Sequence, residues 1–296
     1  FLLGAAVPLG AQNLVPNPGF ENYSQCPTNL GQIDYAVGWY YPFLTSPDYF
    51  NTCASSADQT GIPQNSAGYQ MPPTGEGYAG LITYLDASVA PESNFRKEVM
   101  AIALTTPLVP GVLTSLSFAI SPTGDGDQLG NRARLTAQGV GLRFSMVPDY
   151  NPFAGLPNAA ALHLSVVPWD TTAWLTVSGL YTPDSAYGYL MVGTFFDDSL
   201  LTPQVLYPGH DIDVAYVFVD EICVAQSGAC GDVALVDHRG AVAIQAYPNP
   251  SNGEVHIGLG EPCHECVAVL SDSFGRACAI YSIENGRTSF DISMED

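Results

Sequence analysis

The chain has 296 residues, with 29 acidic and 8 basic side chains and a formal net charge of −21 at pH 7. A surface this acidic repels phosphate backbones and anionic lipid headgroups, which excludes nucleic acids and anionic membranes as partners. The acidic residues are scattered and 47% of the residues are hydrophobic, so the composition predicts a folded protein and not a disordered one. No apolar run approaches the roughly 18 residues of a membrane-spanning helix.

The segment at residues 1–12 is apolar and ends in small residues. It lacks an initiator Met and a basic start, is too short to cross a bilayer, and has the composition of the end of a signal peptide. A buried first strand is the alternative. We expect a signal-peptide remnant, cleaved near Ala11, and hence an exported protein.

Residues 13–230 are expected to form an antiparallel β-sandwich with long loops. The one candidate helix, around residues 94–103, also reads as a strand. Alternation of apolar with small or polar residues predicts half-buried strands, and almost continuous apolar runs predict strands at the centre of a sandwich. The alternating segments lie at residues 115–120, 140–144 and 175–178, and the continuous runs lie at residues 190–196 and 214–224.

Both ends of this domain carry recognisable segments. It opens with NLVPNPGFE (residues 13–21), has Gly-Trp at residues 38–39, and closes with YVFVDEICV (residues 216–224). This pattern resembles the galactose-binding-like jelly rolls that include many carbohydrate-binding modules, and it implies a jelly-roll β-sandwich. The segments at residues 45–51 and 63–68 also resemble a recurrent surface-protein domain of Bacteroidetes that has no assigned activity.

The same resemblance implies a structural Ca²⁺. In such jelly rolls the acid after the opening Phe and an acid of the last strand hold the ion, and here these are Glu21 and Asp220. Asp220 interrupts an apolar run, and a buried carboxylate needs a partner or a metal. The alternative is that Asp220 points to solvent on the outer face.

Aromatic residues in the first third of the domain form the candidate ligand-binding region. Exposed Tyr and Trp rings stack on sugar rings, and Asn, Asp and Gln beside them bind hydroxyl groups. Trp39 is expected to pack against the core, as it does in the jelly rolls that the chain resembles. The candidate ligand-binding residues are Tyr40, Tyr41, Asp48, Tyr49 and Asn65.

No catalytic residues are predicted. The sequence has no G-x-S-x-G, H-E-x-x-H or P-loop motif, and its five histidines are scattered. Acids such as Asp197, Asp198, Asp211 and Asp213 occur as they would in any chain with 29 of them. We therefore expect a non-catalytic binding or adhesion module, with a glycan or another surface protein as its candidate partner. A structural component of a surface layer or appendage is the second interpretation, and a carboxylate-based hydrolase is the third.

Disulfides are expected because the protein is predicted to be exported. The expected pairs are Cys26 with Cys53 and Cys223 with Cys230. The remaining cysteines, Cys263, Cys266 and Cys278, are odd in number, and the C-x-x-C at residues 263–266 is open to three interpretations. It fits a zinc knuckle, a redox pair or a hairpin disulfide.

About the last 50 residues, 246–296, are predicted to form a small all-β module after a linker at residues 231–245. AYPNPSNG at residues 246–253 predicts an extended entry and a turn, because two prolines fix φ and remove donors. Short alternating runs follow at residues 254–259, 267–271, 277–283 and 289–292.

This module resembles the type A C-terminal sorting domain of proteins exported by the type IX secretion system of Bacteroidetes. The residues that match its motifs are Tyr247, Pro248, Asn249, Pro250, Gly253, Gly275 and Arg276. The resemblance implies export across both membranes, to the cell surface or the medium, with the type IX machinery as partner. The family pattern usually continues for a further strand or two, so we expect the module to be incomplete.

Overall fold

The computed structural model of the chain divides into two compact units, residues 1–230 and residues 231–296. The described residues are 13–55, 59–86, 88, 92, 95–123, 133–210, 212–226, 230, 245–247, 254–258, 267–271, 277–282, 286 and 288–293. The predicted signal-peptide remnant at residues 1–12 lies outside them. No helix in the described part of the chain is long and apolar enough to cross a membrane.

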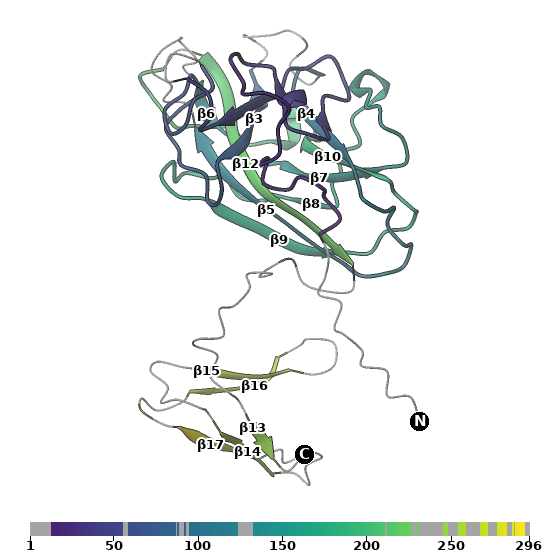
Figure 1. Cartoon of the computed structure of the whole chain (residues 1–296), viewed down its shortest axis with the longest axis vertical. Helices are drawn as coiled ribbons and strands as arrows, with labels where there is room; N and C mark the ends of the chain where they lie inside the picture. The colour runs from purple at the N-terminus through teal and green to yellow at the C-terminus, as the bar shows by residue number, and fades with distance from the viewer. Residues whose placement is uncertain are drawn as a thin grey trace. The chain divides into compact units, whose positions relative to one another are not determined.

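The first unit is a sandwich of two β-sheets (Figure 1). The five-stranded sheet has the order β1 (Trp39–Tyr40), β4 (Val99–Ala103), β10 (Tyr189–Thr194), β7 (Val140–Ser145) and β8 (Leu162–His163). The seven-stranded sheet runs through β11 (Gln204–Val205), β6 (Ala133–Thr136), β12 (Ile212–Gln226), β3 (Gly77–Leu85) and β2 (Asp48–Asn51). In it, β5 (Thr114–Thr123) pairs with both β12 and β9 (Leu175–Tyr181).

The predicted all-β jelly-roll sandwich is confirmed. The chain crosses between the sheets seven times, after β1, β3, β4, β6, β8, β9 and β10, so that strands close in sequence are separated in space. All pairings are antiparallel except that of β6 with β12. The helices of the described part are one-turn 3-10 segments: η1 (Ile33–Tyr35), η3 (Pro152–Ala154) and η4 (Asp198–Leu200). The candidate helix around residues 94–103 is a strand from Val99 onward.

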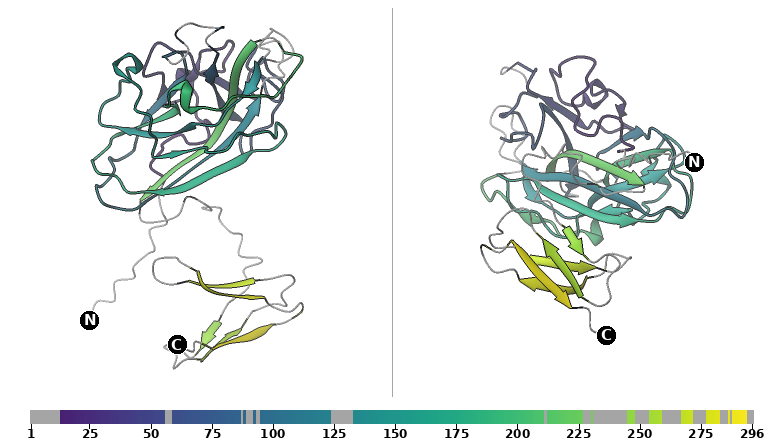
Figure 2. Two further views of the ribbon diagram at one scale, coloured as in Figure 1. Left: turned by 180° about the vertical axis from the view of Figure 1, so that it is seen from behind. Right: turned by 60° about the horizontal axis from the view of Figure 1, so that its bottom comes forward.

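The core lies between the two sheets. Strand β12, the long green strand in Figures 1 and 2, supplies Val217 and Val219 to it, and β5 supplies Phe118 and Ile120. Trp39 is buried, as predicted. Its ring stacks on Phe20 at 4.9 Å, and its Nε1 donates to the Asn17 carbonyl at 2.8 Å.

The opposite face of the seven-stranded sheet is covered as well, by the loop between β2 and β3. A second cluster forms there, because alternate residues of β12 point outward from the main core. Its buried members include Phe50, Ala67, Tyr78, Tyr216 and Phe218. The loop over these side chains therefore buries residues that would be exposed on a bare sandwich.

Both predicted disulfides of the first unit are present. Cys26 bonds to Cys53 and Cys223 bonds to Cys230, each with a Cα–Cα distance of 5.7 Å. The first bond joins the opening loop to the chain just after β2. The second closes a short loop at the end of β12.

In its described residues the second unit is all-β, as predicted. It contains a three-stranded sheet of β13 (Gln245–Tyr247), β14 (Glu254–Gly258) and β17 (Ser289–Ser293), and a pair of β15 (Val267–Ser271) with β16 (Ala277–Ser282). Tyr247 ends β13. The other residues of the sorting motif (Pro248, Asn249, Pro250, Gly253, Gly275 and Arg276) and the C-x-x-C at residues 263–266 lie outside the described residues.

Candidate functional site

Three of the five candidate ligand-binding residues are buried in the first unit. The carboxylate of Asp48 accepts hydrogen bonds from the Gly31 N–H at 2.6 Å and the Tyr216 hydroxyl at 2.5 Å. The Tyr49 hydroxyl donates to the Phe20 carbonyl at 2.9 Å. These hydrogen bonds join parts of the fold. Because both side chains are buried, a ligand in solvent cannot contact them.

Asn65 is the third buried candidate. Its amide nitrogen donates to the Tyr78 hydroxyl at 3.0 Å, and its carbonyl accepts from the backbone N–H groups of Ala67 and Gly68 at 3.0 Å each. Asn65 therefore shapes the loop that covers the outer face of the sheet, and it too is removed from the ligand-binding set.

The other two candidates are Tyr40, the last residue of β1, and Tyr41, which follows it. The Tyr40 hydroxyl donates to the Pro148 carbonyl at 3.0 Å, and burial raises the pKa of this hydroxyl to about 12. Tyr41 is 47% exposed. The Tyr150 N–H donates to the Pro42 carbonyl at 3.2 Å, so the chain after β1 is bonded to the segment before η3.

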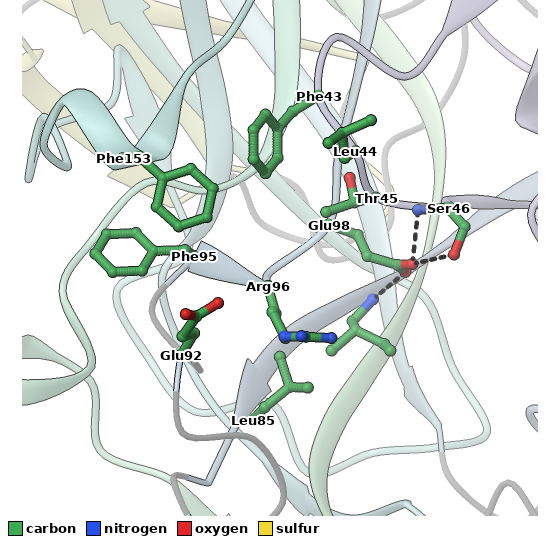
Figure 3. Close-up of a pocket in the computed structure, with 11 residues that line it drawn as sticks. Phe43, Leu44, Thr45, Ser46, Leu85, Glu92, Phe95, Arg96, Glu98 and Phe153 are labelled. Carbon is green, nitrogen blue, oxygen red and sulfur yellow. Dashed lines mark hydrogen bonds between the residues drawn. The ribbon is translucent and has the colours of Figure 1, made fainter.

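A pocket of about 370 Å³ lies next to this junction (Figure 3). Its apolar lining comes from Phe43, Leu44, Ile82, Leu85, Phe95 and Phe153. Its polar lining comes from Thr45, Ser46, Glu92, Arg96 and Glu98. We call it the aromatic pocket. Its volume falls within the roughly 300–1,000 Å³ typical of small-molecule sites.

One wall of the aromatic pocket is a run of three phenylalanine rings from distant segments. The centroid of Phe153 lies 5.5 Å from that of Phe43 and 4.9 Å from that of Phe95. Phe153 is 58% exposed and Leu44 is 92% exposed. The wall therefore continues into an open apolar rim.

Glu98, the residue before β4, forms hydrogen bonds to two parts of the pocket lining. Its carboxyl group accepts hydrogen bonds from the Ser46 N–H at 3.2 Å, the Ser46 hydroxyl at 3.3 Å and the Ile82 N–H at 2.8 Å. Ser46 belongs to the rim and Ile82 to strand β3. A single buried side chain thus holds the rim to the sheet (Figure 3).

Glu98 and Asp48 form a buried acid pair. Burial, with the nearby Asp48 charge as the second cause, raises the pKa of Glu98 to about 8. Burial raises the pKa of Asp48 to about 6, although the hydrogen bonds from Tyr216 and Gly31 lower it. At neutral pH the floor of the aromatic pocket is therefore uncharged at Glu98.

The predicted calcium ligands lie on one side of Gly19. A Cβ added to Gly19 would lie 3.6 Å from Asp220 Oδ1 and 3.8 Å from Glu21 Oε1. Asp220 is fully buried; its Oδ1 accepts from the Glu221 N–H at 2.7 Å, and its Oδ2 has no hydrogen-bond partner. Burial raises the pKa of Asp220 well above its usual value, and the charges of Glu221 and Glu21 raise it further.

The surroundings of this pair fit a cation. The Glu21 carboxylate accepts from the N–H groups of Glu76 and Gly77. Phe20 and Glu221 have φ of 60° and 49°, a strained conformation for non-glycine residues that clusters at functional sites. Two carboxylates and an orphaned buried oxygen match the hard oxygen ligands that Ca²⁺ takes. In the described part of the chain, no three His, Cys, Asp or Glu side chains gather as a metal cluster.

The other acids weighed for catalysis have structural partners where they are described. Asp198 pairs with Lys97 at 2.7 Å, and Asp213 pairs with Arg134 at 2.6 Å. Asp197 caps η4 by accepting from the Ser199 N–H at 2.9 Å. Asp211 lies outside the described residues.

Sequence reasoning missed most of the aromatic pocket. It found the aromatic stretch after β1 but not Phe95 and Phe153, which reach the pocket from other parts of the chain. It also missed Glu98, because a single acid before an apolar run does not reveal its burial. Phe43, two residues after Tyr41, and the neighbouring residues 44–46 stood in the region that the sequence singled out.

No protein-family model matches the chain, and no curated protein sequence does. Among solved structures, the chain is similar to the CBM22-1 and GH10 modules of endo-1,4-β-D-xylanase 10B from Clostridium thermocellum, complexed with xylohexaose. The identity is 13% and the TM-score 0.35, over 74% of this chain and 29% of that one. It is also similar to the CBM22-1–CBM22-2 tandem of Xyn10C from Paenibacillus barcinonensis. The identity is 11% and the TM-score 0.37, over 88% of this chain and 65% of that one. The K1 cleaved adhesin domain of Lys-gingipain from Porphyromonas gingivalis W83 is similar at 13% identity and a TM-score of 0.33. The alignment covers 71% of this chain and 96% of that one. The chain thus spans 29% of the first of these structures and 65% of the second.

Proposed function

We propose that the protein is a non-catalytic glycan-binding module of an exported surface protein, and that the aromatic pocket is its binding site. The observation that carries the proposal is the wall of Phe43, Phe95 and Phe153 beside polar side chains in one hollow. The apolar face of a sugar ring packs on aromatic rings, and its hydroxyl groups need donors and acceptors at the edge. Arg96 and Glu92, both exposed, supply such groups.

The roles of the buried acids support binding over hydrolysis. A glycosidase of the common kind needs two carboxyl groups free to act on either side of the scissile bond. Both oxygens of Glu98 are held by Ser46 and Ile82. Asp48 is buried behind it and held by Tyr216. These groups fix the rim of the pocket and leave no free carboxyl pair in it.

A glycan-array screen of the full chain, followed by calorimetric titration of the best hit, tests this function. Replacing Phe95 and Phe153 together by Ala should weaken binding roughly tenfold or more, because each aromatic contact contributes about 0.5–1.5 kcal/mol beyond its buried area. The matched control is Leu180→Ala, which removes an exposed apolar side chain on β9.

Three other outcomes of this screen would decide against the proposal. No bound glycan would favour a structural component of a surface layer or appendage. Unchanged binding by the double variant would place the site elsewhere. Turnover of a glycan by the wild type would favour the hydrolase.

We further propose that residues 246–296 direct export by the type IX secretion system, on the strength of the motif residues matched in the sequence. The second compact unit, residues 231–296, is compatible with a removable sorting module. In a bacterium with this system, a chain without residues 246–296 should accumulate inside the outer membrane, and cell fractionation measures this. A truncated chain that still reaches the surface would refute the assignment.

We also propose that Glu21 and Asp220 hold a structural Ca²⁺. When bound, the ion would neutralise two neighbouring carboxylates and satisfy the orphaned Asp220 Oδ2. Pro18, beside the site, is already bonded to β12, since its carbonyl accepts from the Ile222 N–H at 3.0 Å. The ion would thus reinforce the attachment of the opening segment to the last strand.

A further inference from the structure

The first unit has few basic side chains, and most of those described already contact an acid or an aromatic ring. Lys97 pairs with Asp198, Arg134 pairs with Asp213, and the Arg143 guanidinium lies 5.9 Å from the Phe195 ring centroid. Among the basic side chains that the structure describes in this unit, Arg96 alone has neither an ion pair nor a ring contact, although the chain carries 29 acidic residues to 8 basic ones.

Arg96 lines the aromatic pocket. It is exposed to solvent and follows Phe95 directly, so one short segment presents both an aromatic ring and a guanidinium. In Figure 3 the guanidinium and the rings of Phe95 and Phe153 stand on different sides of the hollow. A ligand that fills the pocket can therefore meet a ring face and a cation together.

We propose that the aromatic pocket selects acidic sugars, with the carboxylate of a hexuronic acid residue bound to Arg96 and its ring packed on Phe95 and Phe153. This inference rests on the proposed glycan-binding function. A guanidinium matches a carboxylate with two parallel N–H···O bonds, which neutral hydroxyl groups cannot equal.

The rest of the pocket suits such a ligand. Glu92 is exposed on the rim and can accept from hydroxyl groups. Its charge opposes that of a bound carboxylate, but solvent at this exposed position weakens the repulsion. Glu98 adds no repulsion, since burial raises its pKa to about 8 and keeps it protonated at neutral pH.

The net charge of −21 does not prevent the binding of an acidic sugar. Exposed charges more than about 8 Å away are largely screened at physiological ionic strength. The contact with Arg96 acts at hydrogen-bond distance and is screened much less. The scattered surface acids therefore lower the association rate of an anionic ligand more than they lower its affinity.

The test compares one sugar in two charge states. The full chain is titrated with oligosaccharides that contain hexuronic acid, each as the free acid and as its methyl ester. The free acid should bind about tenfold tighter, the effect of a charge-assisted hydrogen bond. Arg96→Gln should abolish this difference, and Arg96→Lys should restore part of it. Arg134→Gln, which removes the same charge elsewhere, should preserve it, and Phe95→Ala should weaken both forms.

The outcomes separate this inference from the function on which it rests. Equal binding of acid and ester, or tighter binding of the ester, overturns the inference and leaves glycan binding intact. Binding of neutral glycans alone overturns it in the same way. If no glycan of either kind binds, the proposed function fails and the inference fails with it.

Discussion

Raising the pH from about 4.5 to 8 should lower the melting temperature, because the buried pair of Asp48 and Glu98 holds protons more tightly in the folded protein. The pKa of Glu98 rises from 4.5 to about 8, and that of Asp48 rises from 3.8 to about 6. Their contribution to stability is fully present below the unfolded pKa values and is lost as the pH rises through the folded ones. A pKa shift of one unit changes the free energy of unfolding by about 1.4 kcal/mol. In a domain of this size each kcal/mol shifts the melting temperature by roughly 2–4 °C.

The pH dependence of thermal unfolding, followed by circular dichroism, measures this effect. Glu98→Gln should reduce the slope of melting temperature against pH, and Asp48 and Asp220, whose pKa values are also raised, account for the slope that remains. At low pH the variant should also be less stable than the wild type, since its amide nitrogen would face a backbone N–H of Ser46 or Ile82. Glu76→Gln, at an exposed acid, is the control. A wild-type slope that Glu98→Gln leaves intact would show that other groups cause it.

The strands of the sandwich were largely predictable from side-chain alternation. Residues 115–120 and 140–144 alternate and became β5 and β7, and the long apolar run at 214–224 became the centre of β12. Segments with a clear period of two bury one face wherever they lie in a sheet, so their pattern survives in any β-sandwich. The same reasoning placed the strands of the second unit within a residue or two.

The candidate ligand-binding residues were harder to place, since alternation does not say what covers the outer face of a sheet. Asp48 and Asn65 stand in loop-like sequence and would be exposed on a bare sandwich. In the structure Asp48 is a buried residue of β2, and Asn65 is buried within the loop between β2 and β3, which folds over the sheet. Their burial depends on contacts with Tyr216 and Tyr78, and sequence patterns do not report such long-range pairs.

The aromatic pocket was unpredictable for a related reason. Its three rings come from the chain after β1, from the segment before β4 and from η3, and only the fold brings them together. The acid pair near Gly19 could be predicted because it rests on two motifs at the ends of the domain. The hydrogen bond from Leu14 to Val224 joins these ends in the structure.

Removing Ca²⁺ should lower the melting temperature if Glu21 and Asp220 hold the ion. Without a cation, Asp220 is a fully buried carboxyl group with one unpartnered oxygen, next to the charges of Glu21 and Glu221. A ligand that binds only the folded protein stabilises it by about 2.7 kcal/mol at a hundredfold excess over Kd. Thermal unfolding with added Ca²⁺ and with a chelator measures the difference.

The variant Asp220→Asn should lose this response, because the amide removes the charge and one ligand oxygen while keeping the shape of the side chain. Asp34→Asn, at an exposed acid on η1, should respond to chelation as the wild type does. Equal melting of the wild type with Ca²⁺ and with chelator would remove the ion from this site. Asp220 would then be a buried neutral acid, which its raised pKa permits.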